Sequence, residues 1–344
     1  EVSDVLTGPF NNMGVPTAKS FHLLSPGYGN LANVPLGLAN PYFVRMASSP
    51  SATILEDAAS QGASFFTISE IGGNDVLGYA TSGGSGTVQT GNPDPSTYGP
   101  SDITDPTLFA GVFTNIVQAM TANGAKGAVV TVPSIVNLPY FTTVPYNAVP
   151  LDQATADLLN AGYAAYNGGL QAAFAALTGT GLFTEEELNK RTINFTAGSN
   201  AVVIIDEDLT DLGAINPAFA DIPQYRQATA DDFLVLTSSS FIGTPDDNDP
   251  SLINGLSLPL SDEWVLTPEE QSNIQIATDA YNAAITSIGN ANGLAVVDLD
   301  GLLSEAATSG TQFDDFTMTT TLVFGGMVSL DGIHLTTRGY ALMA

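Results

Sequence analysis

Short apolar runs bounded by turn residues constrain the fold of this chain more than any other feature of its sequence. Four runs stand out, and a weaker fifth joins them: 65–68, 128–132, 202–205, 294–299 and 233–236. Their apolar residues are continuous rather than alternating, which is typical of strands that are covered on both faces in a parallel sheet. Parallel strands need helical crossovers between them, so this interpretation also predicts helices between the runs.

Helical patterns do separate the runs. One apolar face precedes the 128–132 run and consists of Leu108, Val112, Ile116 and Met120. The clearest helix begins at a Thr-Pro-Glu-Glu segment, 267–270, which combines a capping box with proline at the first helical position. We expect this helix to end at Gly289 and a further helix to cover 152–177. The alternation predicts an α/β fold with a mostly parallel sheet.

Composition limits the classes of partner. Only 7 basic residues stand against 35 acidic ones, and the resulting net charge of −28 opposes binding to nucleic acid or to anionic membrane surfaces. Cysteine is absent, which rules out disulfides, thiolate metal sites and a cysteine nucleophile within these residues. With two histidines, a catalytic zinc site is not favoured, and we expect no metal and no cofactor.

The length of 344 residues and the 44% hydrophobic content allow a sizeable core. One large domain over 1–344 with inserted loops is the simplest organisation. No apolar run approaches the ~20 residues that a membrane-spanning helix needs, so no transmembrane segment is expected. The chain begins without Met and stops within a helical pattern, from which we expect it to be truncated at both ends.

Two long polar stretches, 81–101 and 244–259, are expected to border the mouth of a cleft, with unrelated surface insertions as the alternative. The second contains an acidic cluster at 246–249 that lacks the ligand spacing of an EF-hand loop. A solvated loop is favoured there, and calcium binding stays open.

Two short motifs contain the residue types that acyl transfer requires: a base, a group that orients it, and donors for an oxyanion. His334 is the candidate base, and Asp331, three residues upstream, can reach its imidazole. Asn74, in a Gly-Gly-Asn-Asp segment directly after the 65–68 run, is the candidate oxyanion donor. Each motif alone is also typical of an ordinary turn. The remaining histidine, His22, lies in an apolar context and is interpreted as structural.

Taken together and in this order, the motifs resemble the signature blocks of the SGNH (GDSL-type) hydrolases. The segment 72–75 resembles the third block, 331–340 the fifth, and 12–17 the second. The resemblance implies a triad containing Asp331 and His334, with oxyanion donors at Asn74 and at the second block's glycine positions, here Gly14 and Thr17. Thr17 departs from the family pattern, and its Cβ restricts the backbone.

The resemblance also implies a three-layer α/β/α sandwich and hydrolysis of a carboxylic ester, whether of a lipid, a short acyl group or an acetylated sugar. The family's nucleophile block, Gly-Asp-Ser-Leu, has no counterpart, because the sequence contains no Gly-Asp-Ser. We therefore expect the serine to lie upstream of residue 1 and residues 1–344 alone to be inactive. The alternative is a non-catalytic cell-surface binding or structural protein on the same scaffold.

The long spacing between the third and fifth blocks resembles that of the larger bacterial members of the family. Those members are secreted or are lipoproteins at the cell surface. The expected location is therefore outside the cell or on its surface, with a lipid-bearing cysteine upstream as one means of attachment.

Overall fold

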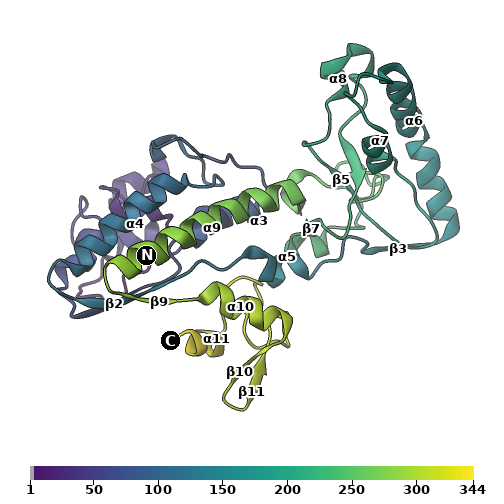
Figure 1. Cartoon of the computed structure of the whole chain (residues 1–344). Helices are drawn as coiled ribbons and strands as arrows, with labels where there is room; N and C mark the ends of the chain where they lie inside the picture. Colours follow the sequence, from purple (N-terminus) through teal and green to yellow (C-terminus); the bar gives the residue numbers. More distant parts are fainter. Residues whose placement is uncertain (1–3) are drawn as a thin grey trace.

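A three-stranded parallel sheet joins segments from distant parts of the chain (Figure 1). The computed structural model describes residues 4–344. The strand order is β1 (Phe65–Ile68), β2 (Lys126–Val130) and β9 (Ala295–Val297). Phe66 pairs with Gly127, and Val129 pairs with Val296. Three of the five predicted runs therefore form parallel strands with helices between them, and the chain is a mixed α/β protein.

Helices α3 (Gly73–Thr81) and α4 (Pro106–Thr121) pack against the long helix α9 (Pro268–Ala291), as Figure 1 shows. Phe109 of α4 stacks on Tyr281 of α9 with ring centroids 4.2 Å apart. Both rings belong to the main core cluster together with Val129 of β2. The predicted capping box is present, since Thr267 and Glu270 cap α9 reciprocally.

The expectation that α9 ends at Gly289 is wrong. The helix continues to Ala291, and Asn292 caps it. A Cβ at Gly289 would lie 2.8 Å from Cγ2 of Val129. Glycine therefore permits the helix to approach the sheet closely here, and its role is packing rather than termination.

Residues 144–266 form a lobe beyond the N-terminal end of α9 (Figure 1), and its residues Val235 and Leu266 join the main core cluster. The predicted helix over 152–177 is α6 (Gln153–Leu177), with Asp152 as its N-cap. The lobe also contains α7 (Glu185–Arg191), α8 (Leu212–Ile215), β3 (Val149–Leu151), β4 (Gly198–Asn200), β5 (Val203–Ile205), β6 (Tyr225–Gln227), β7 (Phe233–Leu234) and β8 (Val265–Leu266). The lobe has hydrophobic clusters of its own.

The prediction that the 202–205 and 233–236 runs belong to the parallel sheet is wrong. They form β5 and β7, which pair antiparallel with β6 and β8 in the lobe. Ile204 of β5 and Leu234 of β7 are completely buried. Continuous apolarity indicates burial on both faces, and here the lobe's own clusters provide that burial outside the three-stranded parallel sheet.

The last part of the chain packs as a small unit with a cluster that includes Leu303, Met318 and Met327. It contains α10 (Leu299–Thr308), the hairpin β10 (Thr311–Phe313) and β11 (Phe316–Met318), and α11 (Thr337–Met343). Shorter helices elsewhere are α1 (Pro41–Val44), α2 (Ile54–Ser60) and α5 (Pro139–Thr142). Across residues 4–344, no helix has the combination of length and apolarity needed to cross a membrane.

Candidate functional site

Asp331 and His334 lie in a tight turn between the bridged residues Val328 and Leu335. Gly332 makes the turn possible with a φ of +74°, a region that glycine enters without a Cβ clash. Oδ2 of Asp331 lies 2.7 Å from Nδ1 of His334, so the hydrogen bond expected from their spacing is present. Both side chains are accessible, with 65% of His334 and 49% of Asp331 exposed.

The other oxygen of Asp331, Oδ1, accepts three hydrogen bonds. The donors are the hydroxyl of Ser329 at 2.6 Å and the backbone N–H groups of Ile333 at 2.9 Å and His334 at 3.0 Å. Desolvation raises the pKa of Asp331, but these donors outweigh it and hold the pKa well below its usual value. An ionised Asp331 can only accept from the imidazole, so Nδ1 carries the proton and Nε2 is left to act as a base.

Asn74 is the second residue of α3, and the turn before it depends on Gly72, the N-cap, with a φ of +97°. The side-chain amide of Asn74 donates to the carbonyl of Ala18 at 3.0 Å. The structure thus brings the third block into contact with Ala18, the residue directly after the second block, although the two are far apart in sequence. A carboxamide has two N–H groups, so this contact leaves Asn74 with a second donor.

The backbone of the second block is left-handed at Thr17. Thr17 has a φ of +65°, which is uncommon for a residue with a branched Cβ. Its hydroxyl accepts from the amide of Asn40 at 3.3 Å. The N–H of Gly14 donates to Oδ1 of Asn12 at 2.8 Å, so this donor is already used within the turn.

A side-chain contact joins the fifth block to the segment before Gly72. The hydroxyl of Tyr340 on α11 donates to Oε1 of Glu70 at 3.2 Å. Burial and the negative charge of Glu70 raise the pKa of Tyr340 to about 12, so the phenol stays protonated. Among the described residues, no hydrogen bond joins Asn74 directly to His334.

Sequence reasoning missed the buried support beneath Asn74. Asp75 is completely buried and accepts from the backbone N–H of Ser20 at 2.9 Å and its hydroxyl at 2.7 Å. Burial raises the pKa of Asp75. The carboxyl thus fixes the start of α3 against the segment that follows the second block. The only signal in the sequence was that Asp75 directly follows Asn74, and nothing indicated that Ser20 would be its partner.

His22 has the structural environment expected for it. Its ring stacks on Tyr28 with centroids 4.4 Å apart, and Nδ1 accepts from the N–H of Lys19 at 3.0 Å. Burial, together with the charge of Lys19, lowers the pKa of His22 to about 4. A histidine that is neutral at physiological pH suits a packed position.

Carboxylates hold both long loops. Asp102, directly after the first loop, accepts from the N–H of Thr87 and the amide of Gln89 within it. In the second loop, Asp246 and Asp249 accept from backbone N–H groups of residues 248–251. Neither loop lines the cavity of about 620 Å³ at the carboxyl ends of β2 and β9. Their expected place at the mouth of a cleft stays a prediction.

Comparison of the chain with models of known families, with curated proteins and with solved structures finds no match.

Proposed function

We propose that this chain is part of an SGNH-type carboxylic ester hydrolase. The observation that supports this most directly is the Asp331–His334 pair, 2.7 Å apart, in which a carboxylate of strongly lowered pKa holds an exposed imidazole. That arrangement prepares a general base whose Nε2 faces away from Asp331. The ester would come from a lipid, a short acyl group or an acetylated sugar, and the reaction needs no cofactor.

In the proposed mechanism a serine from outside residues 1–344 attacks the ester carbonyl. His334 takes the serine proton at Nε2 and later returns it to the leaving alcohol, while Asp331 stabilises the imidazolium. The second N–H of Asn74 donates to the oxyanion, with the backbone N–H of Thr17 as a further donor. Loss of one such donor typically costs roughly 10²–10³ in rate.

The unpaired edge of the parallel sheet leaves room for an additional strand, on which we propose that the serine lies. β1 pairs with β2 on one side, and among the described strands none pairs with its other side. Phe65 at the start of β1 is 61% exposed. A further parallel strand along this edge would cover Phe65, would end beside the Gly72 turn, and would extend the sheet toward a three-layer α/β/α sandwich. We also propose that the protein is secreted or attached to a bacterial cell surface.

The test compares p-nitrophenyl ester hydrolysis by residues 1–344, by a longer natural chain containing the preceding residues, and by its His334→Ala variant. We expect a burst of acylation only in the longer chain with His334 intact. Activity that survives His334→Ala would refute the mechanism. An inactive longer chain, or one without a Gly-Asp-Ser segment before residue 1, would favour the non-catalytic surface protein, which the absence of Gly-Asp-Ser within these residues already makes the second candidate.

A further inference from the structure

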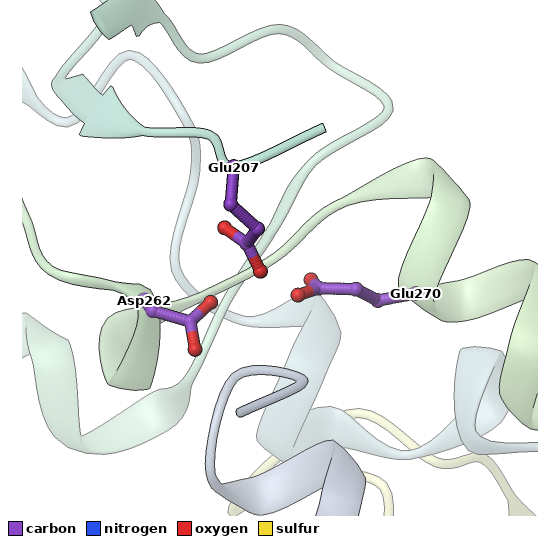
Figure 2. Close-up of side chains that lie close together, drawn as sticks. All are labelled: Glu207, Asp262 and Glu270. Atoms are coloured by element: carbon purple, nitrogen blue, oxygen red, sulfur yellow. The ribbon is translucent and has the colours of Figure 1, made fainter. Parts of the chain in front are cut away.

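Three carboxylates from separate elements meet where the lobe joins α9. Glu207 follows β5 in the lobe, Asp262 begins the short helical turn Asp262–Trp264, and Glu270 lies in the first turn of α9. Figure 2 shows their side chains pointing toward one another. One oxygen from each lies within 4.8 Å of those of the other two. No lysine or arginine forms an ion pair with any of the three among the described residues.

Glu270 is the member that most needs a partner. Only 3% of it is exposed, and its Oε2 accepts from the N–H of Thr267 at 2.6 Å. Its other oxygen, Oε1, is buried without a hydrogen-bond partner among the described residues, and the Glu270 carboxylate points toward the other two carboxylates (Figure 2). Leaving such an acceptor unsatisfied costs on the order of 1–3 kcal/mol, and more when it is charged.

Two glycines allow the backbone to approach this cluster closely. A Cβ at Gly84 would lie 2.0 Å from Oε1 of Glu270, and one at Gly83 would lie 1.8 Å from the carbonyl oxygen of Asp262. Both glycines have positive φ, at +65° for Gly83 and +82° for Gly84. Any side chain at Gly84 would therefore fill the space directly in front of the unpartnered oxygen.

Facing carboxyl groups must share either a proton or a cation. Exposed Glu207 keeps the cluster open to solvent on one side, which gives an ion a route of entry.

We propose that Glu207, Asp262 and Glu270 bind one calcium ion. Oxygens bound to one calcium at about 2.3–2.6 Å lie no more than roughly 5 Å apart, which the spacing of the three carboxylates satisfies. The site offers only hard oxygen ligands in an irregular arrangement, which suits calcium better than magnesium with its strict octahedron. The ion ties the lobe to α9 and supplies the missing partner of Oε1.

Terbium luminescence tests the proposal, because Tb³⁺ substitutes for calcium and is sensitised by a nearby indole. The chain's single tryptophan, Trp264, lies two residues from Asp262. We expect saturable Tb³⁺ emission with one ion per chain, displaced by calcium. The double variant D262N/E270Q should lose affinity at least tenfold, whereas D247N, which removes an exposed carboxylate of the 246–249 cluster, should bind as the natural chain does.

Thermal unfolding in EDTA and in calcium gives a second readout. Calcium should raise the Tm of the natural chain and leave that of D262N/E270Q unchanged. If the double variant folds poorly, E207Q is used in its place. Because Glu207 is exposed, we expect this variant to stay folded and to bind Tb³⁺ more weakly. Absence of saturable emission, unchanged affinity in E207Q, or equal Tm with EDTA and calcium would overturn the proposal and indicate a shared proton instead.

Discussion

At the scale of single residues, Ser329 positions Asp331, and the proposed mechanism predicts how much the rate depends on it. Ser329→Ala removes one donor from Oδ1 of Asp331 and leaves the two backbone N–H donors. In the longer chain that the proposed function requires, we therefore expect the rate of ester hydrolysis to fall about tenfold or less, whereas Asp331→Asn should cost on the order of 10²–10⁴ in rate by destroying the tautomer of His334. Steady-state rates measure both.

Ser239→Ala is the matched control for this pair. Its hydroxyl donates to a backbone carbonyl in an exposed turn of the lobe, so its loss should leave the rate unchanged. A Ser329→Ala rate as low as that of Asp331→Asn would contradict the view that the backbone donors suffice to hold the carboxylate.

His22 should make stability depend on pH in a predictable direction. Its folded pKa of about 4 lies below the ordinary histidine pKa of 6.5. Between pH 4 and pH 6.5, the unfolded chain therefore binds a proton at His22 that the folded chain does not bind. Stability from this group is complete above about pH 6.5, is lost as pH falls toward 4, and amounts to at most about 3 kcal/mol.

Urea unfolding at pH 7, 5.5 and 4 for the natural chain and for His22→Gln isolates this contribution. The difference between the two curves should shrink as pH falls, because glutamine does not titrate. NMR titration of the ring should also show His22 neutral at pH 5.5. A midpoint near 6.5 would contradict the stacked, buried environment.

At the scale of elements, the two neighbouring glycines at the start of α3 should differ in how much stability is lost when each is replaced by alanine. A Cβ at Gly72 would lie 2.7 Å from Cγ2 of Val132 and 3.1 Å from Phe109, at a φ of +97°. A Cβ at Gly73 meets nothing within 4 Å. We expect Gly72→Ala to lose about 2–4 kcal/mol from strain and overpacking, and Gly73→Ala to change stability by less than about 1 kcal/mol.

Chemical denaturation of the two alanine variants measures this difference. Equal midpoints would mean that the turn relaxes without cost. Because Gly72 precedes Asn74 by two residues, the Gly72 variant should also displace the contact between Asn74 and Ala18.

Elements whose signals are local could be predicted from the sequence. The capping box of α9 lies within four residues, and α6 begins one residue after its aspartate cap, so their N-termini were found correctly. The pairing of β5 and β7 could not be found, because apolar continuity shows that a strand is buried but not which strand lies beside it. That choice depends on the lobe's tertiary packing.

The same distinction applies to sites at the scale of the whole molecule. The Asp331–His334 contact spans three residues of one turn, so its geometry followed from spacing. Glu207, Asp262 and Glu270 gave no sequence signal, because their proximity depends on how the lobe folds against α9. The acidic cluster that the sequence did indicate, 246–249, instead uses Asp246 and Asp249 to cap its own turn.

At the scale of the whole molecule, a buried ion network also holds the centre of the lobe. Arg226 is 1% exposed and makes two hydrogen bonds of 2.6 Å to the carboxylate of Asp232, and it also contacts buried Asp206. Arg226→Met would leave both aspartates buried without their cation, which typically costs about 3–5 kcal/mol. Lys190→Met removes a positive charge 3.5 Å from the same Asp206, but Lys190 is 38% exposed, so its loss should cost less than about 1 kcal/mol.

Hydrogen exchange followed by mass spectrometry should locate the effect of Arg226→Met. The lobe has separate hydrophobic clusters around α6, whereas β2 and α4 belong to the main core. We therefore expect faster exchange in 144–266 and nearly unchanged exchange in 106–130, because opening the lobe need not open the parallel sheet. Uniformly faster exchange would show instead that the lobe and the sheet unfold as one cooperative unit, coupled through the carboxylates at the start of α9.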